Sequence, residues 1–433
     1  MIRLCQKISS ETITIPPLLI PQLTIALVPR RPNSRWADVP FNPPDSIFGL
    51  LEAFHKDPSP NKINLGIGAY RTDSSQPYVL PSVRKAEEKL RKKNLNKEYS
   101  FIAGSTEFCQ LSFDFALGED NVISKEGLNA TVQTISGTGA LSLMALFLKR
   151  FYPGEKTIYL PKHTWNNHIT VFSFFNLPLD YYRYYDEPAR KLDYQGLIED
   201  LSNIPDASMV LFHPCAHNPT GMDPDQDQWV ALSRLAKEKD LFVLFDMAYQ
   251  GFATGDADVD AFAVRQFASE GVPFALSQSW SKNMGLYGER TGALTILGDS
   301  KDDVRRILSQ LKGKIRAIYS NPPIHGARIV TEILTDPELK QQWLGEMKGM
   351  IDRMISVRKV LRESLLKYGS VHDWGHIVKQ KGMFCFTGMD AKQVERMTRE
   401  FKIYMGKDGR ISIAGVTTKN VDYIARAMHE VTK

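Results

Sequence analysis

The sequence predicts an α/β protein: a large domain with a mostly parallel sheet flanked by helices, and a smaller α+β domain built from the N- and C-terminal segments. Between residues 130 and 297, short apolar runs of strand length alternate with helical patterns, which is typical of a parallel sheet. After about residue 325 the pattern changes to long helical segments and a short mixed tail. The length, 433 residues, also favours two domains over one simple core.

The expected strands are apolar runs of the kind found in buried parallel sheets. They are 130–136, 156–160, 208–213, 241–246, 273–279 and 292–297. Helical patterns lie between them at 140–150, 226–239 and 258–270. Further helices are expected at 327–334 and 337–368, and the mixed tail contains "GMFCFTG" and "RISIAG".

Composition excludes several classes of protein. The chain is 43% hydrophobic and 24% charged with a net charge of +5, and without a Lys/Arg-rich block it gives no sign of nucleic-acid binding. No apolar run reaches 18 residues, so no membrane span is expected. The four cysteines form no C-x-x-C pair, which favours a reducing compartment. His213 and His217 are not expected to bind metal, because Pro214 and Pro219 disfavour the helix that would align them.

Residues 1–33 differ in composition from the rest of the chain. They contain a single acid, Glu11, with several basic residues, serines and threonines. This composition weakly resembles a mitochondrial transit peptide, and a disordered tail is the alternative.

Polar groups follow several of the expected strands, at the edge of the sheet where ligands bind in open α/β folds. The strand 130–136 ends in the turn "SGTG", and 208–213 leads to Asn218. The strand 241–246 ends in Asp246 with Tyr249 just beyond, and 273–279 ends in Ser279 with Lys282 close by. We therefore expect these groups to converge on one crevice.

The turn "SGTGAL" could hold a phosphate at a helix N-terminus, although a tight packing turn is an equal alternative. It is not a dinucleotide fingerprint, because Ser142 replaces the third glycine and position 159 is Tyr. Asp246 could be a helix cap or part of a buried ion pair, or it could pair with a protonated ring nitrogen. Lys282 could form a Schiff base with a carbonyl if its pKa is lowered, and Arg290 would lower it and could bind phosphate. These parts together describe a pyridoxal phosphate site.

The motifs resemble those of a known family. "SWSKNMGLYGERTG" is similar to the lysine signature of class I aminotransferases, and "HPCAHNPTG" and "FDMAYQGF" are similar to companion motifs. "SNPPIHGARIV", "NLGIGAYR", "EYSFIAG" and "GRISIAG" resemble the aspartate aminotransferase branch. The resemblance covers roughly residues 35 to 433 and implies the fold of type I pyridoxal-phosphate-dependent transferases.

The resemblance implies a role for each matching residue. Lys282 would be the Schiff-base lysine and proton shuttle, Asp246 would pair with the pyridine nitrogen, and Tyr249 and Asn218 would bond the ring oxygen. Trp165 would stack on the ring and His168 would support Asp246. The cofactor's phosphate would be held by a larger set: Ser136, Gly137, Thr138, Ser279 and Arg290, with Tyr99 reaching it from the other subunit.

The same resemblance implies the substrates. Arginine forks match planar carboxylates, so Arg410 would bind the α-carboxylate and Arg316 of the partner chain the side-chain carboxylate. Gly68, with Ile67, would sit on a loop that closes over the substrate. The implied reaction transfers the amino group of L-aspartate reversibly to 2-oxoglutarate, giving oxaloacetate and L-glutamate by a ping-pong mechanism in a homodimer with shared active sites.

Other interpretations stay open at this stage. Tyr319 and Gly288 depart from the usual residues of animal members, so a broader aminotransferase acting on aromatic or kynurenine-type substrates is an alternative. A non-catalytic binding protein on the same fold is another. The expected organisation is a transit peptide or tail at 1–33, an arm and part of the small domain at 34–77, the large domain at 78–345 and the rest of the small domain at 346–433. The mitochondrial matrix is the expected location, with a cytoplasmic or plastid form as the alternative.

Overall fold

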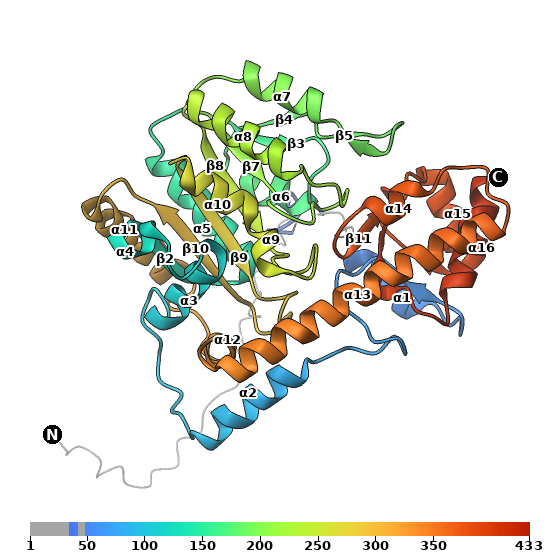
Figure 1. Ribbon diagram of the computed structural model, residues 1–433, viewed down its shortest axis with the longest axis horizontal. Coiled ribbons are helices and arrows are strands. Elements are labelled where there is room, and N and C mark those ends of the chain that lie inside the picture. Colours follow the sequence, from blue (N-terminus) through green and yellow to red (C-terminus); the bar gives the residue numbers. More distant parts are fainter. Residues whose placement is uncertain (1–33, 42–47) are drawn as a thin grey trace, which may run out of the picture. The chain divides into compact units, whose positions relative to one another are not determined.

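The computed structural model describes residues 34–41 and 48–433. Its largest sheet has seven strands in the order β2-β10-β9-β8-β7-β3-β4 (Figure 1). These strands are β2 (Asn129–Ile135), β3 (Ile158–Pro161), β4 (Leu179–Tyr182), β7 (Met209–Phe212), β8 (Phe242–Met247), β9 (Phe274–Ser279) and β10 (Thr291–Leu297). Neighbours pair in parallel from β4 to β9, and β10 is antiparallel to both β9 and β2. The predicted α/β class with a mostly parallel sheet is confirmed.

All six expected strands are present within two residues of their predicted ends. The prediction missed the seventh, β4, at the edge of the sheet. Its sequence "LDYY" has an intermediate, two exposed and one buried residue. An edge strand with one solvent-facing side lacks the continuous apolar run that identified the central strands.

Helices cover both faces of the sheet. On one face α5 (Ser136–Phe151), α6 (Asn166–Phe174) and α11 (Lys301–Ile318) share an apolar core with the strands. On the other face lie α3 (Thr106–Leu117), α7 (Tyr194–Asn203), α8 (Gln226–Glu238) and α10 (Phe262–Ser269). The helix expected at 258–270 is divided, because Ala261 separates α9 (Ala257–Asp260) from α10.

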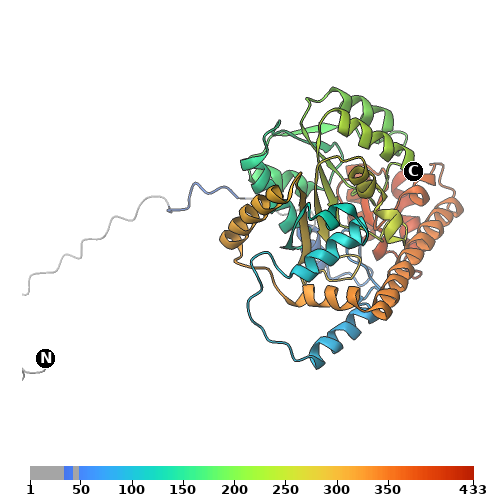
Figure 2. The ribbon, with the colours of Figure 1, turned by 60° about the vertical axis from the view of Figure 1, so that its left-hand side comes forward.

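The C-terminal part is dominated by α13 (Pro337–Lys367), preceded by α12 (His325–Thr335), and both predicted helices are confirmed. The Asp336 carboxylate caps α13 by accepting from the backbone N–H groups of Glu338 and Leu339, at 3.0 and 3.1 Å. Figures 1 and 2 show α13 beside α2 (Pro81–Lys92) and extending to the C-terminal helices. Those helices are α14 (Gly375–Lys379), α15 (Ala391–Phe401) and α16 (Val421–Thr432).

Short strands join distant parts of the sequence. β11 (Phe384–Phe386) pairs antiparallel with β13 (Arg410–Ser412), and β1 (Ile63–Asn64) pairs in parallel with β12 (Ile403–Tyr404). The segment near residue 63 therefore lies with the C-terminal segments. The helix α13 runs unbroken through the expected boundary at 345. The domain boundaries therefore stay a prediction. The remaining elements are α1 (Phe48–Lys56), α4 (Val122–Glu126), β5 (Tyr185–Asp186), β6 (Lys191–Leu192) and η1 (Ile413–Gly415). Among the described helices, none is long and apolar enough to cross a bilayer.

The sheet brings its polar termini to one edge. β2, β7, β8 and β9 end there, and the antiparallel β10 begins there directly after Arg290. Close approach at this edge needs Gly292, because a Cβ on that residue would lie 2.6 Å from the carbonyl carbon of Ser136. The first turn of α5 can therefore sit directly against β10.

Candidate active site

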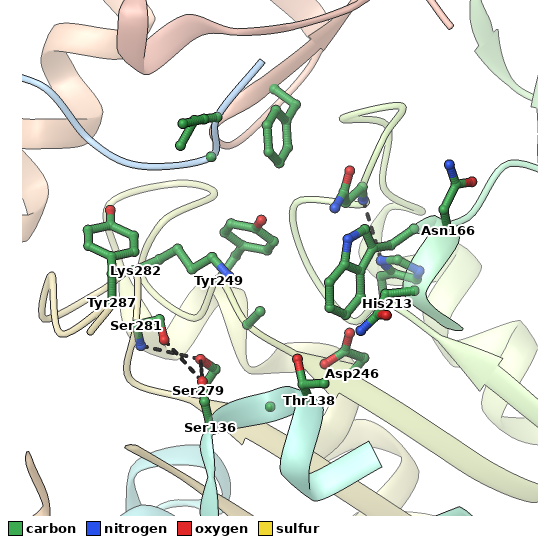
Figure 3. A pocket seen from close by; sticks show the side chains of 18 of the residues that line it. Ser136, Thr138, Asn166, His213, Asp246, Tyr249, Ser279, Ser281, Lys282 and Tyr287 are labelled. Carbon is green, nitrogen blue, oxygen red and sulfur yellow. Dashed lines mark hydrogen bonds between the residues drawn. The ribbon is translucent and has the colours of Figure 1, made fainter. Parts of the chain in front are cut away.

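A cavity of about 640 Å³ opens at the carboxyl edge of the sheet (Figure 3). It is lined by twelve of the residues that the sequence predicted: Gly68, Ser136, Gly137, Thr138, Trp165, Asn218, Asp246, Tyr249, Ser279, Lys282, Arg290 and Arg410. Most of them come from the ends of strands that are far apart in the chain. The structure brings them together in one crevice, as expected from the sequence.

One wall of the cavity is rich in hydrogen-bond donors. The Ser136 hydroxyl lies 3.0 Å from the hydroxyls of both Ser279 and Ser281, and all three side chains are buried. Ser136 is also the first residue of α5, with φ of 59°, so the unpaired N–H groups of the first helical turn point to the same place. Arg290 lines the same cavity, and together these groups could hold an anion.

Asp246 provides the negative charge of the cavity. Burial would raise the pKa of its carboxyl, but the hydrogen bond from His168 and the nearby positive charges outweigh burial, so the pKa is lowered. His168 Nε2 lies 2.8 Å from Asp246 Oδ2. Asp246 is therefore a carboxylate aimed into the cavity, with His168 behind it.

A line of hydrogen bonds extends behind that pair. Because a carboxylate only accepts, His168 donates through Nε2 and its Nδ1 accepts from the Thr164 hydroxyl at 2.8 Å. That hydroxyl lies 3.2 Å from His213 Nε2, which donates to it. Burial lowers the pKa of His213 to about 3, so His213 is neutral. The line fixes the tautomer of His168 that donates to Asp246.

Lys282 has the electrostatics of a reactive amine. Its side chain is half-buried, and its Nζ lies 5.2 Å from the centroid of the Tyr249 ring (Figure 3). Burial lowers the pKa of Lys282 to about 8; the Asp246 charge opposes that shift, and the Arg290 charge adds to it. A useful fraction of the amine is therefore neutral near pH 7 and can act as a nucleophile or base.

Arg410 also lines the cavity. It donates through Nη1 to Asn218 Oδ1 at 2.9 Å, and its guanidinium carbon is 4.1 Å from the centroid of the Phe384 ring. The same ring approaches the loop that carries Gly68, because a Cβ on Gly68 would lie 2.6 Å from the ring edge. The guanidinium is thus a fixed donor fork for a carboxylate.

Three predicted residues do not line this cavity. Tyr99 is 87% exposed, and Arg316 is exposed on α11, where it donates to the Ser320 hydroxyl. His168 is not a lining residue, but it contacts the cavity through Asp246.

Sequence analysis missed several lining residues, and three of them make contacts that matter for the site. Ser281 completes the trio of hydroxyls, and Tyr287 accepts a hydrogen bond from the Tyr70 backbone N–H at 2.9 Å. Phe384 packs against Arg410. Ser281 and Tyr287 lie within the lysine motif itself and could have been considered, but Phe384 lies in a run that reads as an ordinary apolar strand.

Comparison with known proteins identifies the kind of fold and site. Residues 60–428 match the family model "Aminotransferase class I and II". The mitochondrial aspartate aminotransferase of Xenopus tropicalis is 53% identical over 412 residues, which is 95% of this chain and 96% of that protein.

Solved structures agree. The cytoplasmic aspartate aminotransferase of Saccharomyces cerevisiae has a TM-score of 0.90 at 40% identity and covers 92% of this chain and 98% of its own. An aromatic-amino-acid aminotransferase of Burkholderia pseudomallei, covalently bound to pyridoxal phosphate, has a TM-score of 0.89 at 38% identity, with 93% and 100% coverage.

The lowered pKa of Lys282 can be measured in the cofactor-free protein. Only the neutral amine reacts with an acylating reagent, so we expect the acetylation rate of Lys282, followed by mass spectrometry, to rise with pH through about 8 and then level off. A solvated lysine keeps gaining reactivity up to about pH 10.4.

Two variants should move this midpoint in opposite directions. Arg290→Gln should move the midpoint to higher pH because it removes a neighbouring positive charge, and Asp246→Asn should move it lower because it removes the negative one. A midpoint near that of a solvated lysine in the unaltered protein would contradict the electrostatics described for the cavity.

Proposed function

The chain belongs to the class I and II aminotransferases and has aspartate aminotransferase activity, and we propose that it transfers the amino group of L-aspartate reversibly to 2-oxoglutarate by a ping-pong mechanism. One observation carries the residue assignments. A lysine amine with a pKa of about 8, a buried carboxylate and a guanidinium fork line the same cavity. Amino transfer needs all three kinds of group, namely a base, a counter-charge and a carboxylate-binding site.

The cofactor is pyridoxal phosphate, and the residues present fit it. The three mutually facing serine hydroxyls and the free N–H groups of α5 match a phosphate. The buried Asp246 carboxylate, whose only ion-pair contact among the described residues is with His168, matches a protonated ring nitrogen. The cavity therefore offers one fitting group for each end of the molecule.

From this fit we assign a contact with the cofactor to each residue. Its phosphate would be held by Ser136, Gly137, Thr138, Ser279 and Arg290. Asp246 would bind the ring nitrogen, with His168 holding Asp246 in place. Trp165 would cover one ring face, Asn218 and Tyr249 would donate to the ring oxygen, and the Lys282 amine would attach to the aldehyde carbon.

When bound, the cofactor supplies a carbon that accepts the amine and a ring that withdraws electrons. The protein supplies the proton transfer: Lys282, with a pKa near 8, would take the proton from the substrate Cα and deliver it to the cofactor carbon that is bonded to the amine nitrogen. Asp246 keeps its negative charge because its pKa is lowered. The loop with Ile67 and Gly68 lines the cavity mouth and would exclude water when the substrate is bound.

Two arginines would select dicarboxylic substrates. Arg410 lies within the cavity and would bind the carboxylate common to all amino and oxo acid substrates. Arg316 would bind the second carboxylate. Since Arg316 is exposed and does not line the cavity of its own chain, we assign this contact to the cavity of a second copy.

A homodimer with shared sites follows from that assignment. Tyr99 and Phe101 are 87% and 79% exposed, and Ile102 is 37% exposed. A run of large exposed apolar side chains is typical of an interface. Tyr99 would reach the cofactor phosphate in the partner's cavity, just as Arg316 would reach the partner's substrate.

A broader specificity for aromatic or kynurenine-type substrates is the competing assignment within the same chemistry. Aromatic-amino-acid aminotransferases are among the similar solved structures. An assay of the purified protein with aspartate and phenylalanine separates the two. A non-catalytic role is a weaker alternative, because a pure scaffold has no need of a lysine amine with a lowered pKa.

For the location of the protein, we propose the mitochondrial matrix. Similar curated proteins from Xenopus tropicalis and Gallus gallus are mitochondrial forms, and residues 1–33 have one acid among several basic residues. These residues lie outside the described part of the chain. A fluorescent fusion of residues 1–33 should enter mitochondria; uniform cytoplasmic or plastid fluorescence would contradict the proposal.

The role of Arg316 predicts a substrate-dependent loss. Arg316→Asp replaces an attraction for the second carboxylate by a repulsion, so turnover of aspartate, as kcat/KM, should fall about a hundredfold or more. Turnover of phenylalanine, which lacks that carboxylate, should change much less. Equal losses for both substrates would show that Arg316 does not bind the second carboxylate.

Shared sites predict recovery of activity in a mixed dimer. Lys282→Ala and Arg316→Asp should each be nearly inactive with aspartate when expressed alone. In a hybrid of the two, one site has an intact Lys282 and the partner's intact Arg316, so a random mixture should recover about a quarter of normal activity. If both residues acted within one chain, mixing would recover nothing.

A further inference from the structure

Arg358 is a buried arginine without a carboxylate partner. It lies on α13, is 3% exposed, and among the described residues it forms no ion pair. Its guanidinium donates only to backbone carbonyls: Ile377 O at 2.9 Å, Gly382 O at 2.9 Å and Phe384 O at 2.5 Å. The adjacent Cys385 is no counter-charge, because burial raises the pKa of its thiol to about 11.

Such an arrangement is costly for stability alone. Removing a charged group from water is unfavourable unless it is paired, and an apolar residue of similar size often stabilises as well. The role of Arg358 is therefore indicated by where its three carbonyl partners lie rather than by its charge. All three lie on one segment, 377–384, which leads into β11.

Phe384 connects this segment to the carboxylate-binding site. Its backbone carbonyl accepts from Arg358, while its ring lies 4.1 Å from the Arg410 guanidinium. β11 also pairs with β13, with Phe386 opposite Arg410. A shift of β11 would therefore move Arg410 both through the strand pairing and through the ring that supports its guanidinium.

The part of the cavity near Lys282 also contacts α13. Trp343 of α13 is fully buried and donates from its indole N–H to the carbonyl of Asn283 at 2.7 Å. Asn283 is the residue after Lys282. Trp343 and Arg358 are 15 residues apart, which is about 22 Å along a helix. A single rigid helix thus contacts both the turn of the lysine and the strand of the carboxylate-binding arginine.

From this geometry we propose that Arg358 is a positioning residue that fixes Phe384 and Arg410 relative to Lys282 and so sets the affinity for the substrate α-carboxylate. The proposal rests on the proposed function, in which Arg410 binds that carboxylate. The role proposed for Arg358 differs from that of Arg316. Every amino and oxo acid substrate carries an α-carboxylate, whereas only dicarboxylic substrates carry a second carboxylate.

Two variants of the holoenzyme test this role. Arg358→Met keeps the length of the stem and leaves three buried carbonyls without a donor, whereas Arg358→Lys keeps the charge and some of the donors. Lys359→Met is the matched control: it makes the same change from a cation to methionine at the next position of α13, where the side chain is exposed.

We expect Arg358→Met to raise KM about tenfold for aspartate and for phenylalanine alike, with kcat changed less than about threefold. The Kd of succinate, a dicarboxylate that cannot be transaminated, should rise by a similar factor in calorimetry. The absorbance spectrum of the substrate-free holoenzyme and its pH dependence should not change. Arg358→Lys should lie between Arg358→Met and the unaltered protein, and Lys359→Met should match the unaltered protein.

Several results would overturn the proposal. One is a fall of kcat at constant KM, or an altered spectrum without substrate, since both place the effect at Lys282 or the cofactor. Another is an unchanged succinate Kd in Arg358→Met. If that variant does not fold, Arg358→Lys decides: an unchanged KM and succinate Kd overturn the role. Failure of the unaltered protein to transaminate aspartate would instead overturn the proposed function, while succinate binding would still test Arg358.

Discussion

The buried charge of Asp246 is the constraint on which the site depends. A carboxylate at the end of a central strand is stable only with partners, and His168 supplies the hydrogen bond that keeps its pKa low. Thr164 and His213 in turn fix the donor nitrogen of His168. The same charge limits how far the pKa of Lys282 falls. The acid, the base and the two histidines behind them are therefore one electrostatic unit.

The second constraint is geometric. The three serine hydroxyls and Lys282 lie at the edge of the sheet, whereas Arg410 and Phe384 belong to strands near the C-terminus. The long helix α13 contacts both groups, through Trp343 and Arg358. A reaction that must hold a carboxylate at a set distance from a base needs such a rigid connection, and a continuous helix is a stiff way to make it.

Much of the fold was predictable because central strands and long helices have strong local patterns. The six predicted strands and α8, α12 and α13 lie where the patterns indicate. The edge strand β4 was missed because its outward side is polar, and 258–270 was read as one helix because a break at Ala261 leaves the apolar pattern unchanged. In the site, Ser281 and Phe384 look like ordinary residues until the strand ends are brought together.

The sequence by itself determined the chemistry: a lysine, an acid and a small-residue turn at successive strand ends, in an order that resembles one family. Parallel strands end at one edge, so this order implied their convergence without coordinates. Only the tertiary structure decided the pKa of Lys282, the neutrality of His213, and the placement of Arg316 outside its own cavity. Burial and contacts between residues far apart in the chain set these properties, and no local pattern encodes them.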